Sequence, residues 1–136
     1  MQVTENLTVA DGICAYVPRG RVSLVEGVAL VARAIEQCRA RRIRKMLLDV
    51  TNLTGYPIPT IDDRFWMAQD WAQAAQGELI LAAVALPEYI HPGKFGVKAA
   101  ADAGLKSDVF TSVADAKAWL IANEPDAPGT KRDAIR

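Results

Sequence analysis

The stretch KMLLDVTNLTGYPIPT, residues 45–60, carries the clearest fold signal in this chain. Its first part, residues 45–51, is a short apolar run after a basic cluster, which is typical of a buried strand. The next part, residues 52–59, contains a glycine and two prolines and is predicted to form a loop. Thr60 then opens a helix that is predicted to reach Gln76, because acidic side chains in its first turn complement the helix dipole. Strand, loop and helix in this order are the repeating unit of an α/β fold.

Toward the N-terminus, the sequence predicts a hairpin and a helix. Two strands are expected at residues 3–9 and 13–17, and the dipeptide Asp11-Gly12 between them is a strong turn signal because both residue types tolerate positive φ. Residues 23–26, SLVE, form a capping box, in which the serine and the glutamate satisfy each other's backbone amides. A helix with one apolar stripe is predicted to follow, over residues 24–41.

Toward the C-terminus, strands and helices are predicted to alternate: a strand over 79–86, a loop over 87–94, a helix over 95–103, a strand over 107–110 and a helix over 112–122. The expected fold class is therefore α/β, with a mixed, mostly parallel sheet, an N-terminal β-hairpin and about four flanking helices. The loops after the parallel strands are expected to share one edge of the sheet. Residues 1–123 are predicted to form one domain, and residues 124–136 a flexible C-terminal tail.

The composition of the chain is that of a globular domain. Of 136 residues, 51% are apolar, and 16 basic side chains balance 16 acidic ones, which excludes a collagen, a disulfide scaffold and a largely disordered chain. The zero net charge makes nucleic acid an unlikely partner, although residues 19–45 carry eight basic and two acidic side chains. Most of this excess lies in a cluster of five cations: Arg39, Arg41, Arg42, Arg44 and Lys45. We favour a dipole-complementing and solubilising role for the cluster over contact with nucleic acid, anionic lipid or an acidic partner.

The cysteines and the N-terminus bear on the compartment. Cys14 and Cys38 fit no zinc or redox spacing, and their apolar neighbours predict two buried thiols. No signal peptide is visible at the N-terminus, and the longest apolar stretch, residues 79–87, is too short to span a bilayer. We therefore expect no transmembrane segment and a cytoplasmic location.

Several short segments resemble the STAS family, the sulphate-transporter and anti-sigma-factor-antagonist domains. Residues 16–23, YVPRGRVS, followed by an amphipathic helix and by residues 45–54, KMLLDVTNLT, resemble the opening of these domains. Three further segments look like a bacterial branch of small stand-alone STAS/SEC14-like proteins: DRFW at 63–66, KFGV at 94–97 and VFTS at 109–112. The resemblance covers roughly residues 3–122. It implies a mixed sheet flanked by helices and a role in protein–protein regulation, or, in some relatives, in nucleotide or lipid binding.

The resemblance fails at one functional position. Anti-sigma-factor antagonists carry an Asp-Ser-Ser-Gly-type segment at the start of the helix after the central strand, and a partner kinase phosphorylates its serine. The corresponding residues here are 57–60, PIPT, so the acceptor position falls on Ile58, which has no hydroxyl. Thr60 is close by, but helix capping explains it better. We therefore expect a module without the usual phosphoacceptor serine.

The leading hypothesis is a non-enzymatic regulatory or protein-interaction module. Its partner-binding surface is predicted to comprise Thr54, Tyr56, Ile58, Thr60 and Trp66. The partner is expected to be another protein or a second copy of the chain, as in a homodimer.

The helix expected over residues 62–76 carries this surface. One stripe at helical spacing is predicted to face the core: Ile61, Phe65, Ala68, Ala72 and Ala75. Trp66 and Trp71 lie off that stripe, so at least one of them is expected to be partly exposed or to pack under the neighbouring loop.

An alternative hypothesis is a carrier of a small apolar ligand or lipid, of the SEC14-like type, with a pocket between the sheet and the helix over 62–76. His91, Lys94 and Phe95 are the candidate ligand or anion contacts, because a lysine at a helix start can hold an anion. A third hypothesis, an enzyme using His91 as a base, has less support because no nucleophile elbow, P-loop or dinucleotide motif is present. One histidine and two separated cysteines predict no metal site, and no cofactor is expected.

Overall fold

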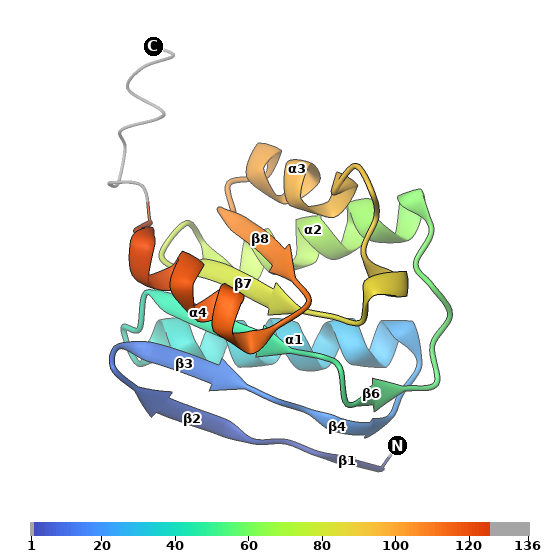
Figure 1. Ribbon diagram of the computed structural model, residues 1–136, viewed down its shortest axis with the longest axis horizontal. Coiled ribbons are helices and arrows are strands. Elements are labelled where there is room, and N and C mark those ends of the chain that lie inside the picture. The colour runs from blue at the N-terminus through green and yellow to red at the C-terminus, as the bar shows by residue number, and fades with distance from the viewer. Residues whose placement is uncertain (1, 126–136) are drawn as a thin grey trace.

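The computed structural model describes residues 2–125 and shows an α/β architecture of strands and helices (Figure 1). The expected fold class is confirmed. The strands are β1 Gln2–Thr4, β2 Leu7–Ala10, β3 Ile13–Tyr16, β4 Arg19–Arg21, β5 Lys45–Asp49, β6 Leu53–Thr54, β7 Ile80–Val84 and β8 Ser107–Phe110. The α-helices are α1 Leu24–Ala40, α2 Ile61–Ala75, α3 Phe95–Asp102 and α4 Val113–Ala122, and a short 3-10 helix spans Pro87–Tyr89.

The main sheet has five strands in the order β2-β3-β5-β7-β8. Strands β3, β5, β7 and β8 run parallel, and β2 joins antiparallel to β3 through the predicted hairpin. Asp11 and Gly12 form its turn with φ angles of 55° and 76°, the left-handed conformation that this dipeptide accepts. Because the parallel strands alternate with helices, their carboxyl ends lie at one edge of the sheet, as expected.

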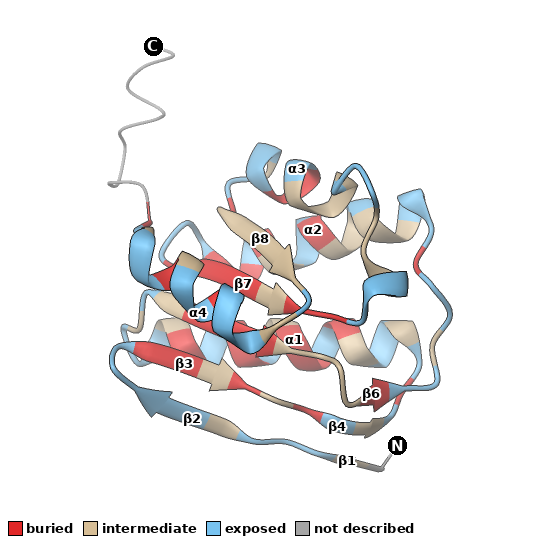
Figure 2. Cartoon of the chain, viewed as in Figure 1, coloured by how far each residue is buried: buried red, intermediate tan, exposed pale blue. Residues whose placement is uncertain are grey.

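Helices cover both faces of this sheet (Figure 1). Helices α1, α2 and α3 form one cluster of buried side chains with Met46, Leu48 and Leu81, while α4 packs on the other face against Leu47 and Ile80. Figure 2 shows the consequence: β3, β5 and β7 are largely buried, whereas the outer strand β2 is mostly exposed. This agrees with the sequence, in which the central strands are continuous apolar runs.

A second, three-stranded sheet, in the order β1-β4-β6, was not predicted. Its strands are two or three residues long and include the polar segment at Arg19–Arg21, so they lack the apolar periodicity that marks a strand. Strand β6 pairs with β4 through Leu53 opposite Gly20, and the amide of Val22 donates to the carbonyl of Thr54 at 2.8 Å. The small sheet thereby fixes the first half of the loop that follows β5.

The prediction of two free thiols is wrong. Cys14 on β3 and Cys38 on α1 are both fully buried, as expected, but they are joined in a disulfide. Their 24-residue separation gives no short-range signal, because the pairing depends on how α1 packs on the sheet. Disulfides are rare in cytosolic proteins, so this bond does not favour the cytoplasmic location expected from the sequence.

The buried face of α2 also differs from the prediction. Ala68, Ala72 and Ala75 are buried, as expected, but Ile61 is 45% exposed and Phe65 is 52% exposed. Ile61 and Phe65 precede Ala68 in the helix, so the predicted stripe is buried only from Ala68 onward.

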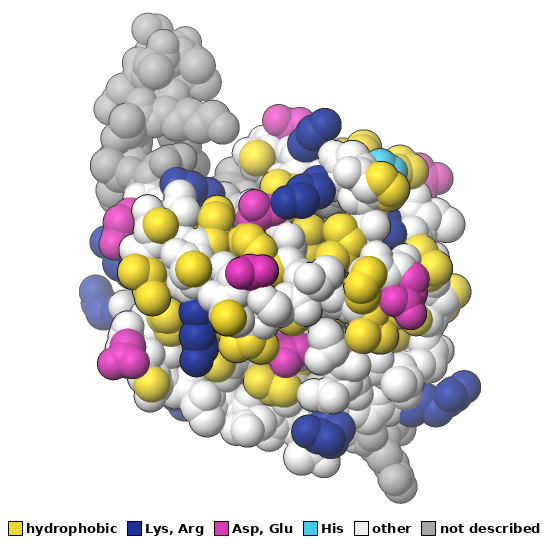
Figure 3. Space-filling model, viewed as in Figure 1, with side chains coloured by type: hydrophobic (Ala, Val, Ile, Leu, Met, Phe, Trp, Pro, Cys, Tyr) yellow, Lys and Arg dark blue, Asp and Glu magenta, His cyan; other side chains and the backbone are white. Residues whose placement is uncertain are grey.

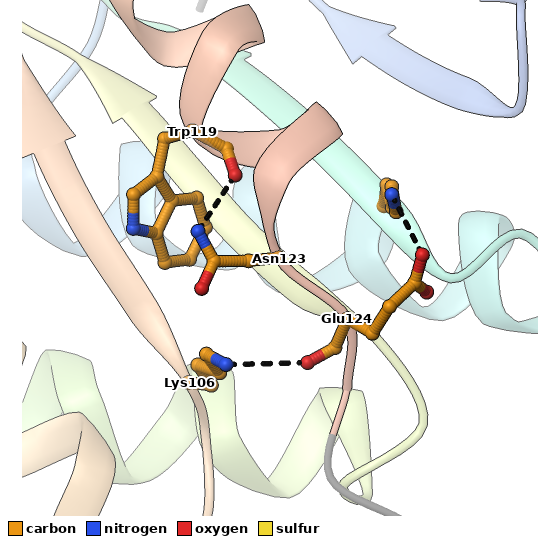
Figure 4. Close-up of polar contacts among 5 residues, drawn as sticks. Lys106, Trp119, Asn123 and Glu124 are labelled. Carbon is orange, nitrogen blue, oxygen red and sulfur yellow. Dashed lines mark hydrogen bonds and ion pairs between the residues drawn. The ribbon is translucent and has the colours of Figure 1, made fainter.

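The C-terminal end of α4 is held by polar contacts (Figure 4). Asn123 Nδ2 donates to the carbonyl of Trp119 at 2.8 Å, Lys106 Nζ donates to the carbonyl of Glu124 at 3.3 Å, and the Glu124 carboxylate pairs with Lys45 Nζ at 3.0 Å. Glu124, predicted to begin the tail, is thus anchored, and residues 126–136 lie outside the described part of the chain. Among the helices in residues 2–125, none is long and apolar enough to cross a membrane.

Candidate functional site

Two loops meet at the carboxyl edge of the main sheet. Tyr56, in the loop after β6, and Tyr89, in the short helix after β7, have ring centroids 5.3 Å apart and tilted by 53°. The Tyr89 hydroxyl donates to the Tyr56 carbonyl at 3.3 Å. Burial, with a smaller contribution from Tyr89, raises the pKa of Tyr56, so this phenol stays protonated at neutral pH. The two tyrosines join the loops into one wall.

Behind this wall lies a pocket of about 180 Å³, between the sheet and helices α1, α2 and α3. Its lining is predominantly apolar and includes Val28 of α1, Leu48 of β5, Met67 of α2, Leu81 of β7 and Val97 of α3. Tyr89, Ile90 and His91 also line it and are only half-buried, so the pocket reaches the surface beside this loop.

Small side chains leave this space open. Each layer around the pocket contributes a residue with little or no side chain: Gly27 of α1, Ala68 of α2, Ala83 of β7, Gly96 and Ala100 of α3. Interiors are ordinarily packed without voids larger than a water molecule, so small residues converging from four elements are the local cause of the cavity. The sequence shows these alanines and glycines, but not that they face one another.

Three charged side chains line the pocket: Arg64, Lys94 and Asp108. Lys94 Nζ pairs with Asp108 Oδ1 at 2.8 Å, so these two charges compensate each other. Arg64 Nη1 donates to the Tyr89 carbonyl at 3.1 Å, which ties α2 to the loop after β7. Desolvation by burial lowers the pKa of Arg64, but a guanidinium stays charged at neutral pH. Among the described residues, no carboxylate lies within ion-pair distance of Arg64.

His91 lies at the pocket with its ring fixed. Its Nδ1 accepts from the backbone amides of Gly93 at 3.0 Å and Phe95 at 3.4 Å, so the neutral ring carries its proton on Nε2. The ring meets Phe95 edge-on at 6.4 Å between centroids. Of the three predicted ligand contacts, His91 and Lys94 line the pocket, whereas Phe95 packs against the core beside it.

The predicted partner-binding residues make different contacts within the chain. Tyr56 faces the pocket. Thr60 is the N-cap of α2, in a capping box with Asp63, and Trp66 donates from Nε1 to the same carboxylate at 3.2 Å. The exposed Thr54 donates its hydroxyl to Gly20 at 3.4 Å, in the small sheet. Their role in binding a partner stays a prediction.

Ile58 is an exposed apolar side chain in the loop just before α2. It is 53% exposed and precedes two further exposed apolar side chains on α2, Ile61 and Phe65. We call these three residues the apolar face of α2. The sequence predicts Ile61 and Phe65 in the core, and this prediction is wrong. Apolar periodicity identifies a stripe of side chains along a helix, but it does not show how much of that stripe is covered by the rest of the protein.

The basic cluster is partly neutralised by neighbours. Arg39 pairs with Glu78 at 3.7 Å and donates from Nε to the carbonyl of Ala74 at 3.0 Å, which links α1 to α2. Arg39 therefore has a structural role at the end of α1. No group of three metal-ligating side chains is found within residues 2–125.

Comparison with known proteins identifies the fold. No protein-family model matches the chain, and no curated protein matches it significantly. The chain is similar to the crystal structure of an anti-sigma factor antagonist from Mycobacterium paratuberculosis, with a TM-score of 0.58 and 15% identity over 88% of this chain and 95% of that one. It is also similar to an uncharacterised protein with a SpoIIAA-like fold from Shewanella loihica PV-4, with a TM-score of 0.52 and 15% identity over 87% and 93% of the two chains. The chain therefore has the STAS-like fold of these two structures, as its sequence resemblance implied.

Proposed function

We propose that the protein binds a small apolar molecule in the pocket beneath α2. The observation that carries this proposal is the pocket itself, about 180 Å³ of apolar-lined space that opens beside Tyr89 and His91. Concave apolar sites with a few convergent polar groups are the usual form of ligand sites. The proposal is for binding and not for catalysis, because Nδ1 of His91, the atom that would act as a base in the neutral ring, already accepts from two backbone amides.

The volume limits the size of the ligand. A buried apolar cavity of about 150 Å³ is known to hold one benzene molecule, so this pocket suits a single ring or a chain of about eight carbons. Each buried methylene contributes roughly 0.8 kcal/mol, which gives such a molecule useful affinity before any polar contact is made.

The experiment is a titration with 1-octanol, followed by tryptophan fluorescence, to which Trp71 contributes, and by the NMR signals of the Ala68 methyl group. Both residues line the pocket. We expect saturable changes in the wild-type protein and at least about tenfold weaker binding in Ala83→Leu, which fills part of the space. Ala114→Leu, on the exposed side of α4, is the matched control and should bind normally. Absence of a saturable change in the wild-type protein would overturn the proposal.

A second function, protein interaction, is favoured by the apolar face of α2. Ile58, Ile61 and Phe65 are each about half exposed, and exposed apolar clusters commonly mark partner surfaces. One structural neighbour is named an anti-sigma factor antagonist, which supports a regulatory module acting through a protein partner or a second copy.

Sedimentation of wild-type protein and Phe65→Ser tests self-association through this face. We expect dimers in the wild type and monomers in Phe65→Ser. Apolar side chains are also spread over the face of the molecule that α4 and β8 cover (Figure 3), and Ile121 of α4 is 72% exposed. Ile121→Ser is therefore the matched control and should remain dimeric. Equal association of all three proteins would remove α2 as the dimer surface.

A further inference from the structure

Among the charged side chains that line the pocket, one positive charge has no ion-pair partner within residues 2–125. Its charged side chains are Arg64, Lys94 and Asp108, and the last two pair with each other at 2.8 Å. We infer that the ligand is a small monocarboxylate, with an apolar body of about eight carbons or one ring in the pocket and its carboxylate held by Arg64. This inference rests on the proposed ligand-binding function and specifies the chemical class of the ligand.

The hydrogen bonds around Arg64 leave most of its guanidinium available. Within residues 2–125, its one hydrogen bond runs from Nη1 to the Tyr89 carbonyl, so four of its five N–H donors have no protein acceptor. The planar fork of a guanidinium matches the two oxygens of a carboxylate, and such paired contacts are among the stronger hydrogen bonds in proteins.

The neighbouring acid Asp63 makes its hydrogen bonds to other groups. Both oxygens of Asp63 are occupied in capping α2: Oδ2 accepts from the Thr60 amide at 2.9 Å and Oδ1 accepts from Trp66 Nε1 at 3.2 Å. Asp108 is occupied by Lys94 and by the amide of Val109 at 2.8 Å. Asp63 thus attracts Arg64 at longer range, but within residues 2–125 no carboxylate forms an ion pair or a hydrogen bond with the guanidinium, whose remaining N–H groups are open to an acceptor from outside.

Partial burial of Arg64 favours an anionic ligand over a neutral one. Arg64 is half-buried beside apolar walls, where desolvation of the cation is only partly offset by the charge of Asp63, and an incoming anion would offset it further. Because Nδ1 of His91 already accepts two amides, its Nε2–H remains as a donor at the same pocket. The site therefore presents donors and a positive charge, and a ligand with an acceptor-only anionic head complements it.

The test compares octanoate with 1-octanol at pH 7.5, in wild-type protein and in Arg64→Gln. We expect octanoate to bind the wild type at least about tenfold tighter than octanol, since a hydrogen bond to a charged partner is worth that much. Arg64→Gln should lose that preference while binding octanol as before. Arg41→Gln, an exposed arginine outside the pocket, is the matched control and should keep the preference.

The outcomes separate this inference from the function on which it rests. If octanol binds as well as octanoate, or if Arg64→Gln weakens both equally, the assignment of the carboxylate to Arg64 is overturned and the pocket remains a ligand site. If neither compound binds the wild type, both proposals fail. Palmitate is the size control, and binding tighter than that of octanoate would overturn the limit of about eight carbons.

Discussion

Reducing the bond between Cys14 and Cys38 should lower the stability of the protein by an amount that the structure sets. The bond closes a loop whose ends are 24 residues apart. In the chain-entropy description, closing such a loop removes about 12 cal/mol/K from the unfolded chain, or about 3.4 kcal/mol at 25 °C. Domains of this size are stable by only about 5–15 kcal/mol, so the reduced protein should lose a large share of its free energy of unfolding.

The assay is urea unfolding followed by tryptophan fluorescence, with oxidised protein and with protein reduced in denaturant and refolded under reductant. We expect the urea midpoint of the reduced protein to be clearly lower, and its thermal midpoint to fall by about 10 °C or more. The double variant Cys14→Ala/Cys38→Ala is the control. It should resemble the reduced protein, with a further loss for the buried sulfur atoms, and reductant should leave it unchanged.

Two results would refute this reasoning. One is alkylation of both cysteines when the untreated protein is unfolded in iodoacetamide, which would mean that the thiols are free, as the sequence alone suggested. The other is an equal urea midpoint for oxidised and reduced protein, which would mean that the unfolded chain gains little freedom when the bond is cut. Alkylation in freshly opened cells would also show whether the compartment keeps the bond oxidised.

Three further predictions concern local features. Hydrogen bonding to the Thr60 amide holds the pKa of Asp63 below its ordinary value. The wild type should therefore be more stable than Asp63→Asn at pH 7, and this advantage should be lost as the pH falls below about 4. Equal differences in urea midpoint between the two proteins at pH 7 and at pH 3 would contradict this. Gly55→Ala should lower the free energy of unfolding by about 2–4 kcal/mol, measured by thermal unfolding, because φ at this position is +96° and the new Cβ would lie 2.7 Å from a β4 side chain. Gly77→Ala, where φ is +70° and the space is open, should lower it by only about 1 kcal/mol. Leu48→Ala should lower the free energy of unfolding by about 2–5 kcal/mol, because Leu48 is fully buried. Leu48→Met, which keeps the side-chain volume, should lower it by less than about 1.5 kcal/mol. Similar losses for the two variants would mean that the structure relaxes to fill the cavity that the alanine leaves.

Local chemistry explains why much of the fold was predictable. The capping boxes at Ser23 and Thr60 place the starts of α1 and α2 within one residue of the structure, because the cap and its acid are three residues apart in the sequence. The turn at Asp11-Gly12 and the apolar runs of β5 and β7 are equally local. Each of these signals contains its own physical cause within a few residues.

The features that were not predicted depend on distant partners. Strand β4 is a strand only because β1 and β6 lie on either side of it, and its own residues are polar. The bond between Cys14 and Cys38 forms because α1 packs on β3. Phe65 is exposed although it shares a helical stripe with the buried Ala68 and Ala72, because nothing in the described chain packs over its end of the stripe. In each case the deciding fact is a tertiary contact, or the place where one ends.

The candidate site also combines residues that the sequence predicted with residues that it did not. His91 and Lys94 were predicted as ligand contacts because a lysine at a helix start can hold an anion and because their loop was expected at the functional edge of the sheet, and both line the pocket. Arg64 was missed because one arginine in a helix gives no signal, and its importance lies in lining the pocket with no ion-pair partner among residues 2–125. The pocket was proposed as an alternative, but its existence rests on small side chains such as Ala83 and Gly96 facing one another.

The two proposed functions meet on consecutive residues of α2. Arg64 lines the pocket, while Phe65, about 100° further around the helix, is 52% exposed. A ligand under this turn and a partner over it would therefore act on the same segment of backbone. If binding of one changes the affinity for the other, the change must be equal in both directions, because the two binding free energies are linked. Arg64→Gln and Phe65→Ser separate the two functions, since each alters one side of the helix and leaves the side chain of the other in place.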